Sequence, residues 1–312
     1  MSVESLCEQL IGIDRSSAGQ CHLLMQPAVE RSEMGEAFDA LLESAGIQPI
    51  PIAIRQIPKT LWPFLIPLDL SKGMHSLLSG QAVEMAMAQR SASSLLAARP
   101  QRACAWVWTP LLTPQLARQL AERAVAHCPH AQGRKRWLRF YDPMVTDLFL
   151  QCSSRSQRAY RFEGVTTWMF LDRWGEWAIS NAVAPALRGD PAVSWPELES
   201  IGALNQAWIG ALRAGTPPDR ATFAQVQCSV GEGRRCGVSS GTDLDLFATH
   251  ALLIGPQFHR HPTVQTLLAQ IAHGERYGDL IRRIGDTEWQ DIRIAASAHA
   301  SAIKGDGAHD ER

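Results

Sequence analysis

The stretch Arg136-Trp137-Leu138-Arg139-Phe140-Tyr141-Asp142-Pro143 has the pattern of a β-strand followed directly by an α-helix. Alternation would place its odd-numbered residues on one face of a half-buried strand and its even-numbered residues on the other. Asp142 is suited to the N-cap of a helix and Pro143 to its first position. Apolar residues at positions 145, 148, 149 and 152 then follow one helix face. The sequence therefore predicts a strand-to-helix junction that ends at Asp142.

Length, charge and cysteine content limit the class of protein. The chain has 312 residues, enough for one large domain or two ordinary ones. Its 30 basic and 31 acidic side chains give a net charge of -1, so nucleic acid is not an expected partner. The seven cysteines are odd in number and scattered, which indicates reduced thiols in a cytoplasmic protein.

Neither a signal peptide nor a membrane span is expected. Glu4 and Glu8 precede the first basic residue, which is unlike the start of a signal peptide. The sequence has no run of about 18 apolar residues, the length expected of a membrane-spanning helix. We therefore expect no membrane partner.

The N-terminal part alternates between strand and helix patterns. Strands are expected at residues 21–25 and 103–108, with helices over 34–45 and from Thr113 as cap with Pro114 in the first position. Prolines demote residues 61–68 to an edge strand or an extended loop. A hairpin is expected from 165–171 and 174–179, with Gly175 as a bulge. Residues 1–185 are thus predicted to form an α/β or α+β lobe with a mixed sheet and flanking helices.

The C-terminal part is dominated by helix patterns. Residues 181–196 are interrupted by proline and glycine and mark a boundary. Ser194 followed by Glu197 resembles a capping box that starts a helix. Further helices are expected over 243–253, 263–272 and 286–303. Residues 195–312 are therefore predicted to form a second, mostly α-helical lobe.

One short motif allows a catalytic interpretation. Gly237-Val238-Ser239-Ser240-Gly241 matches the five-residue pattern of a nucleophile elbow, in which a serine lies on a turn between a strand and a helix. The preceding residues, 231–235, are glycine-rich and charged rather than strand-like. A glycine-rich loop is the favoured interpretation, and a serine hydrolase using Ser239 is the alternative.

No metal or cofactor site is predicted. The histidines occur as His127 with His130, as His259 with His261, and singly, without the further ligands that a zinc site needs. Cys228 and Cys236 have no paired motif elsewhere. The glycines at 231–241 lack the lysine and hydroxyl residue of a phosphate loop. We therefore expect no catalytic, cofactor-binding or metal-binding residues.

Three motifs in the N-terminal half, taken together, resemble those of a known protein family. They are Trp62-Pro63-Phe64-Leu65-Ile66-Pro67-Leu68, Arg139-Phe140-Tyr141-Asp142-Pro143, and Phe162-Glu163-Gly164-Val165-Thr166-Thr167-Trp168 with residues 172–175. In order and spacing they resemble the effector-adaptor chaperone family of bacterial type VI secretion, the Tap/TEC-like adaptor domain. The similarity covers about residues 21–181. Two departures are that Met25 leads into Gln26 rather than an acidic residue, and that Trp62 precedes a Pro63-Phe64 pair.

The resemblance implies a cytoplasmic, non-enzymatic protein. Such a protein binds a cognate toxin effector and helps mount it on the spike-tip protein of VgrG type. Residues after about 195 would then carry effector specificity. The motif residues expected to bind a partner or to maintain the family scaffold are Trp62, Pro63, Phe64, Arg139, Tyr141, Asp142, Pro143, Trp168, Trp174 and Trp177. Arg139 and Asp142 have two open interpretations, a structural tie or a contact surface.

Overall fold

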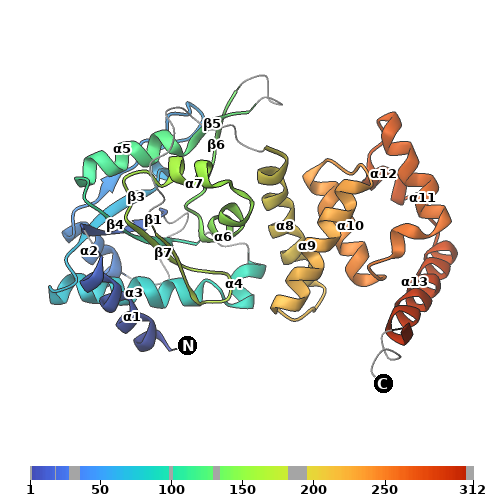
Figure 1. Ribbon diagram of the computed structural model, residues 1–312, viewed down its shortest axis with the longest axis horizontal. Coiled ribbons are helices and arrows are strands. Elements are labelled where there is room, and N and C mark those ends of the chain that lie inside the picture. The colour runs from blue at the N-terminus through green and yellow to red at the C-terminus, as the bar shows by residue number, and fades with distance from the viewer. Residues whose placement is uncertain are drawn as a thin grey trace. The chain divides into compact units, whose positions relative to one another are not determined.

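The computed structural model describes residues 2–17, 19–27, 36–97, 101–128, 134–181 and 195–306. The chain divides into two compact units, Met1–Trp195 and Pro196–Arg312, and each is described by itself. Strands and helices build the first unit, whereas the described part of the second is helical (Figure 1). The predicted fold class is therefore confirmed. Most of the loop predicted at 181–196, including Ser194, lies outside the described residues.

A six-stranded sheet with the order β2-β3-β1-β4-β7-β8 forms the centre of the first unit. Its strands are β1 (Gln20–Met25), β2 (Gln48–Pro49), β3 (Phe64–Leu68), β4 (Ala103–Thr109), β7 (Thr167–Leu171) and β8 (Trp177–Asn181). Neighbouring strands pair antiparallel throughout these residues. Of the two predicted classes, the unit is therefore of the α+β type.

Helices cover both faces of this sheet. One face packs against α1 (Val3–Ser16), α2 (Glu36–Ser44) and α3 (Gly73–Ala88). On the other face, Trp168 packs against Phe162 at a ring-centroid distance of 5.0 Å. Figure 1 shows α5 (Thr113–Arg123), α6 (Pro143–Cys152) and α7 (Arg155–Arg161) on the side away from α1 and α3. All seven residues of β4 are buried because both of its faces are covered.

β3 is not the edge strand that its prolines predict. It lies between β1 and β2 in the sheet. β2, however, has only two residues and pairs with Phe64 and Leu65 alone. Pro67 lies opposite His22 of β1, beyond the end of β2. The missing N–H of Pro67 therefore costs no hydrogen bond to β2, which explains why a proline is tolerated there.

The strand predicted at the junction is shorter than expected. β6 comprises only Lys135–Trp137 and pairs with β5 (Val125–His127) in a separate two-stranded sheet. Phe140 and Tyr141 are 0% and 1% exposed, so they do not alternate between core and solvent as a half-buried strand would. The chain turns at this point, where the N–H of Asp142 donates to the carbonyl of Arg139. The start of α6 is as predicted, with Asp142 as its N-cap.

The first turn of α5 differs from the prediction by one residue. Its N-cap is Leu112, whose N–H donates to the side-chain oxygen of Gln115 at 3.0 Å. Thr113 forms a hydrogen bond with the imidazole of buried His22 instead, at 3.0 Å. The hydroxyl that suggested a cap therefore connects α5 to β1.

The predicted hairpin is confirmed as β7 and β8. Between these strands, Oδ1 of Asp172 accepts hydrogen bonds from the N–H groups of Trp174 and Glu176 at 2.8 and 3.0 Å. Gly175 has φ of +73°, a conformation that glycine adopts without steric cost. Asp172 and Gly175 together explain the tight turn between β7 and β8.

The described part of the second unit contains the four predicted helices and two, α9 and α12, that the sequence pattern does not predict. Its helices are α8 (Trp195–Arg213), α9 (Arg220–Arg235), α10 (Gly241–Leu253), α11 (Pro262–Ala269), α12 (Tyr277–Ile281) and α13 (Asp286–Asp306), with 3-10 turns η3 (Phe258–Arg260) and η4 (Gln270–His273). Residues 231–235 form the end of α9, and the glycine-rich loop predicted at 237–241 connects α9 to α10, which begins at Gly241. A Cβ at Gly233 would lie 3.0 Å from the Phe247 ring, so this glycine allows α9 and α10 to pack closely.

Candidate functional site

The Arg139-Phe140-Tyr141-Asp142-Pro143 motif forms a polar cluster at the start of α6. Arg139 Nη2 donates to Oδ2 of Asp142 at 2.7 Å and to the side-chain oxygen of Gln26. Oδ1 of Asp142 accepts from the N–H of Met144 at 3.1 Å. Gln26 Nε2 donates to the carbonyl of Gln101 at 3.1 Å. Because Gln26 follows β1 and Gln101 precedes β4, Arg139 connects the start of α6 to two central strands. This arrangement agrees with the interpretation of Arg139 and Asp142 as a structural tie.

A buried thiol and a buried phenol accompany this cluster. Burial raises the pKa of the Cys104 thiol to about 12, and the nearby charge of Asp142 adds to the shift. Burial also raises the pKa of the Tyr141 phenol well above its usual range. Both groups are therefore neutral near pH 7, where a thiol is a poor nucleophile. The hydrogen bonds of this cluster tie together elements of the first unit, as those of a scaffold do.

The predicted tryptophans of the hairpin have different surroundings. Trp168 is fully buried in the core. Trp177 donates from Nε1 to the carbonyl of Leu6 at 3.0 Å, and its ring packs edge-on against Trp106 at 5.0 Å. Trp174 is half-buried. Trp168 and Trp177 thus contribute to the packing of the first unit, and a partner contact through Trp174 stays a prediction.

The first motif is also largely built into the fold. Pro63 is buried, and its carbonyl accepts a hydrogen bond from the N–H of Ile50 at 2.8 Å. Phe64 packs against the core from β3. Trp62 ends the 3-10 turn η1 (Lys59–Leu61) and is half-buried, with Lys59 Nζ 5.9 Å from its ring centroid. In the first two motifs, Trp62, Phe64 and Arg139 are half-buried, whereas Pro63, Tyr141, Asp142 and Pro143 are buried.

Arg90 supports the hairpin through hydrogen bonds. No pattern in the sequence predicts this role. Its Nε donates to the carbonyl of Asp172 at 2.6 Å, and its other nitrogens donate to the carbonyls of Ala86 and Leu171. Burial lowers the pKa of Arg90 to about 10, so the guanidinium stays charged near pH 7. This arginine attaches the end of α3 to the turn between β7 and β8.

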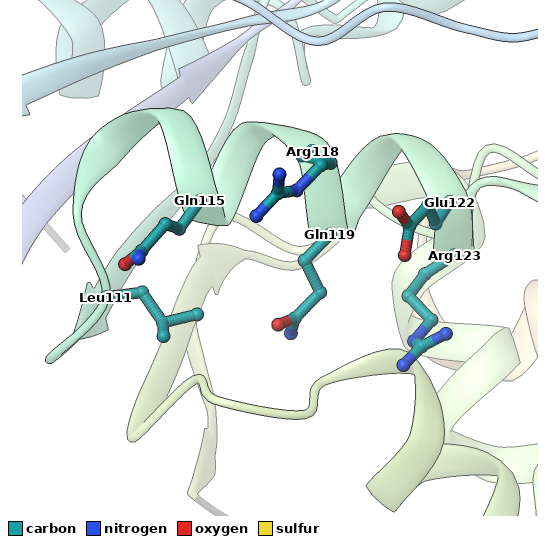
Figure 2. Close-up of a pocket in the computed structure, with 6 residues that line it drawn as sticks. All are labelled: Leu111, Gln115, Arg118, Gln119, Glu122 and Arg123. Carbon is teal, nitrogen blue, oxygen red and sulfur yellow. The ribbon is translucent and has the colours of Figure 1, made fainter.

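An open hollow of about 520 Å³ runs along α5. Figure 2 shows the side chains that line it, which are Leu111, Gln115, Arg118, Gln119, Glu122 and Arg123. Arg123 pairs with Glu163 at 2.6 Å, and Gln119 donates to the carbonyl of Glu163. These contacts attach the loop at Glu163 to α5. The mostly polar lining is more typical of a protein-contact surface than of an enclosed site for an apolar ligand.

Ser239 does not lie on a nucleophile elbow. The segment before it is α9, which ends at Cys236 as C-cap and at Gly237 with φ of +88°. The segment after it is α10, with Ser240 as N-cap. Ser239 is therefore an exposed residue between two helices. A nucleophile elbow requires a strand before the serine, and here a helix precedes it. The serine-hydrolase alternative loses the geometry on which it depended.

The second unit contains a groove of about 740 Å³ beside α10, α12 and α13. Its apolar lining includes Leu253, Ile281 and Trp289. His250 also lines it, and Nδ1 of this histidine lies 2.7 Å from the Tyr277 hydroxyl. Burial lowers the pKa of His250 to about 4, so the ring is neutral near pH 7.

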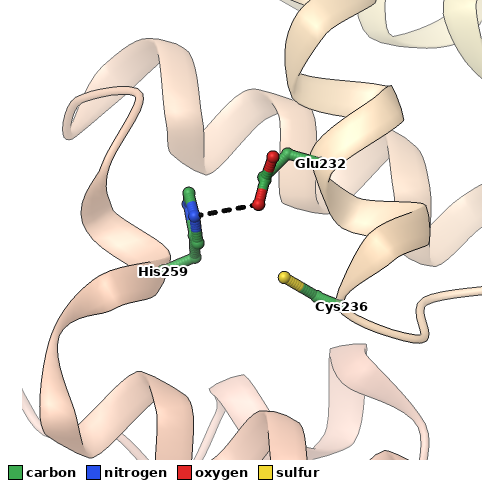
Figure 3. A group of neighbouring side chains, drawn as sticks. All are labelled: Glu232, Cys236 and His259. Carbon is green, nitrogen blue, oxygen red and sulfur yellow. Dashed lines mark ion pairs between the residues drawn. The ribbon is translucent and has the colours of Figure 1, made fainter.

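Another cluster in the second unit combines three potential metal ligands. Glu232, Cys236 and His259 each offer one ligand atom, and these atoms lie within 4.8 Å of one another (Figure 3). This group carries no signal in the sequence, because His259 is distant from the other two residues and the glycines at 231 and 233 disfavour a helix there. A helical interpretation of α9 would have shown Glu232 and Cys236 on one face.

Comparison with known proteins concerns the part of the chain that contains α5 and the junction. Residues 59–160 match the model of a family described as a domain of unknown function, DUF4123. This segment is therefore similar to DUF4123 domains. The domain is known as the effector-associated, Tec/Tap-like chaperone domain of type VI secretion, so the resemblance is confirmed. Neither the curated proteins nor the solved structures yield a significant match.

The DUF4123 segment covers roughly a third of the chain and contains most of the features above. It begins in the turn before Trp62 and includes β3, α3, β4, α5 and α6. The hollow along α5 and the tie from Arg139 to Asp142 lie within it, whereas the β7–β8 hairpin lies beyond its end. Among the described helices, none has both the length and the apolar character needed to cross a membrane.

Proposed function

We propose that this chain is a non-catalytic, cytoplasmic adaptor that binds a type VI toxin effector and helps load it onto a spike-tip protein of VgrG type. The observation that carries the proposal is the DUF4123 match over residues 59–160, a domain of chaperone and adaptor type. The Arg139-to-Pro143 motif lies within this match and has the surroundings of a scaffold.

The surface along α5 supports a role in protein binding. Gln115, Arg118 and Glu122 are exposed on it, and the exposed Leu112 lies at the N-cap of the same helix. Protein interfaces combine such apolar and polar groups, and arginine is enriched in them. We assign a partner contact to this surface, with Trp62, Arg139 and Trp174 as further candidates from the motifs.

The two parts of the chain would have different roles in this function. Residues 1–185 would form the adaptor-family lobe, and residues 195–312 would select the effector. The groove with Leu253, Ile281 and Trp289 supports this role, because apolar grooves of this kind accept an amphipathic segment of a partner.

Co-expression tests the proposal directly. The tagged full-length chain is produced together with any toxin and spike-tip protein that the neighbouring genes encode, and the complex is isolated through the tag. We expect the toxin to co-purify at a fixed stoichiometry, and the spike-tip protein to join when the toxin is present. If neither protein co-purifies, the adaptor function is wrong.

A further inference from the structure

The Glu232, Cys236 and His259 cluster is built by the end of α9 and by η3. Glu232 and Cys236 are four residues apart, so they lie on the same side of the last helical turn. The N–H of Cys236 donates to the carbonyl of Glu232 at 2.9 Å, which holds Cys236 in helical register. Gly237 then ends the helix in a left-handed conformation.

His259 is held against this turn by aromatic packing. It is 7% exposed, and its ring lies 5.9 Å from that of Phe247 on α10. The neighbouring Phe258 packs against the same Phe247 ring at 5.0 Å. Gly233 allows Phe247 to approach α9 closely. The imidazole is therefore positioned in advance and not free to swing into solvent.

The donor atoms have a spacing that suits a metal ion. Nε2 of His259 lies 3.3 Å from Oε1 of Glu232, and Sγ of Cys236 is part of the group within 4.8 Å. Tetrahedral zinc, with bonds of about 2.0 Å to nitrogen or oxygen and 2.3 Å to sulfur, separates its ligand atoms by roughly 3.3 to 3.6 Å. The histidine–glutamate pair already has this separation, and Sγ of Cys236 lies within 4.8 Å of both of its atoms.

The charges around the cluster leave one carboxylate oxygen available. Arg235 pairs with Oε2 of Glu232 at 2.6 Å, which leaves Oε1 facing His259. Outer groups that orient a ligating carboxylate in this way are common at metal sites. Burial and the charge of Glu232 raise the pKa of the Cys236 thiol, and burial lowers the pKa of His259. A neutral imidazole is the form that binds a metal.

We propose that Glu232, Cys236 and His259 bind one Zn²⁺ ion. Mixed sulfur, nitrogen and oxygen donors suit zinc, whereas calcium and magnesium prefer oxygen alone. On binding, the thiol of Cys236 releases its proton to solvent and coordinates as the thiolate. Glu232 and Cys236 are only partly buried, so water can occupy a fourth position. The site is independent of the proposed adaptor function.

A cysteine nucleophile is a weaker interpretation of the same three residues. A cysteine–histidine–carboxylate triad needs one imidazole nitrogen facing the sulfur and the other facing the carboxylate. Here Nε2 of His259 faces Glu232, and the thiol of Cys236 has a raised pKa where a nucleophile needs a lowered one. The convergence of three donors on one point favours a metal ion.

Cobalt titration of the full-length protein tests the site. The protein is reduced, dialysed against chelator and titrated with Co²⁺, followed by competition with Zn²⁺. We expect one Co²⁺ per chain, a thiolate-to-cobalt charge-transfer band in the near ultraviolet, and loss of that band when zinc is added. Cys236→Ser should abolish the band. His259→Gln and Glu232→Gln should weaken binding at least tenfold, since loss of even an outer-shell partner costs about 10- to 100-fold.

Matched variants and a second measurement distinguish a built site from chance binding. Cys228→Ser, at an exposed cysteine of α9, and His261→Gln should leave both the band and the affinity unchanged. In the unmodified protein, zinc should slow alkylation of Cys236 but not of Cys228, as followed by peptide mass spectrometry. Absence of the band, its survival in Cys236→Ser, or equal alkylation of Cys236 with and without zinc would each overturn the proposal.

Discussion

The guanidinium of Arg139 lies 2.7 Å from Oδ2 of Asp142, while Oδ1 of the same carboxylate accepts the N–H of Met144 in the first turn of α6. One buried carboxylate thus caps a helix and holds an arginine that also reaches Gln26 at the end of β1. The position of α6 relative to the sheet depends on both interactions.

Replacement of Asp142 should therefore cost more than the loss of a helix cap. We expect Asp142→Ala to lower the free energy of unfolding by about 1 to 3 kcal/mol, because the cap contributes about 0.5 to 2 kcal/mol and the partly exposed ion pair up to about 1 kcal/mol. Asp142→Asn retains a capping oxygen and should lose only the ion pair. Urea denaturation compares the three proteins, and equal losses in both variants would contradict the capping role.

Gly19 should not tolerate a side chain. Its φ is +101°, and a Cβ would lie 2.3 Å from the carbonyl oxygen of Thr109. We expect Gly19→Ala to destabilise the protein by about 2 to 5 kcal/mol, from the left-handed backbone and the steric clash together. Gly46 has φ of +80° but open space around it, so Gly46→Ala should cost only about 1 to 2 kcal/mol. Thermal unfolding of both variants separates the two effects.

The stability of the protein should fall between neutral and mildly acidic pH. An unfolded histidine binds its proton near pH 6.5, whereas burial lowers the pKa of His250 in the folded protein to about 4. The unfolded state therefore gains protons first, and stability is lost as the pH decreases from about 6.5 toward 4. For this shift the loss is on the order of 2 to 3 kcal/mol.

A non-titrating side chain at position 250 should reduce this pH dependence. His22 and His259 also have lowered pKa values and contribute in the same direction, so the slope should decrease without vanishing in His250→Gln. His273 is exposed, and His273→Gln should retain the full slope. Urea midpoints measured across this pH range, with chelator present, provide the comparison. An unchanged slope in His250→Gln would show that this histidine is not the source.

Charge reversal on α5 should weaken partner binding without harming the fold. Arg118 is exposed on the hollow, and exposed substitutions usually change stability by less than about 0.5 kcal/mol. If this surface is the contact, we expect Arg118→Glu to weaken co-purification of the partner about tenfold, the effect of a moderate interface residue. Arg15→Glu, at an exposed residue of α1, serves as the control. Equal binding by both variants would place the contact elsewhere.

Local signals in the sequence predict helix starts better than strand lengths. Asp142 and Pro143 show where α6 begins because capping depends on neighbouring residues alone. The prediction that the strand continues to Tyr141 is wrong, because aromatic residues that pack on both sides of a turn produce the same alternating pattern as a strand. Phe140, for example, contacts Phe149 on the following helix and the more distant Phe162 and Trp168.

The second unit shows a different limit. Gly231 and Gly233 indicate a loop in isolation, yet α9 continues through both, and Gly233 is needed where Phe247 packs. Helix propensity is a weak signal that tertiary contacts override. For the same reason the sequence could not show that His259 lies beside Glu232. The Arg139 tie was predictable because its partner is three residues away, whereas its second partner, Gln26, was not.

Pro67 has a consequence for the behaviour of this protein at high concentration. A strand with unpaired N–H and C=O groups is a template onto which another chain can add, and this leads to aggregation. β3 continues past the two residues that β2 covers, but at Pro67 it offers no N–H group to an incoming strand. The same proline that removes a hydrogen-bond donor from β3 therefore protects this side of the sheet from unwanted self-association.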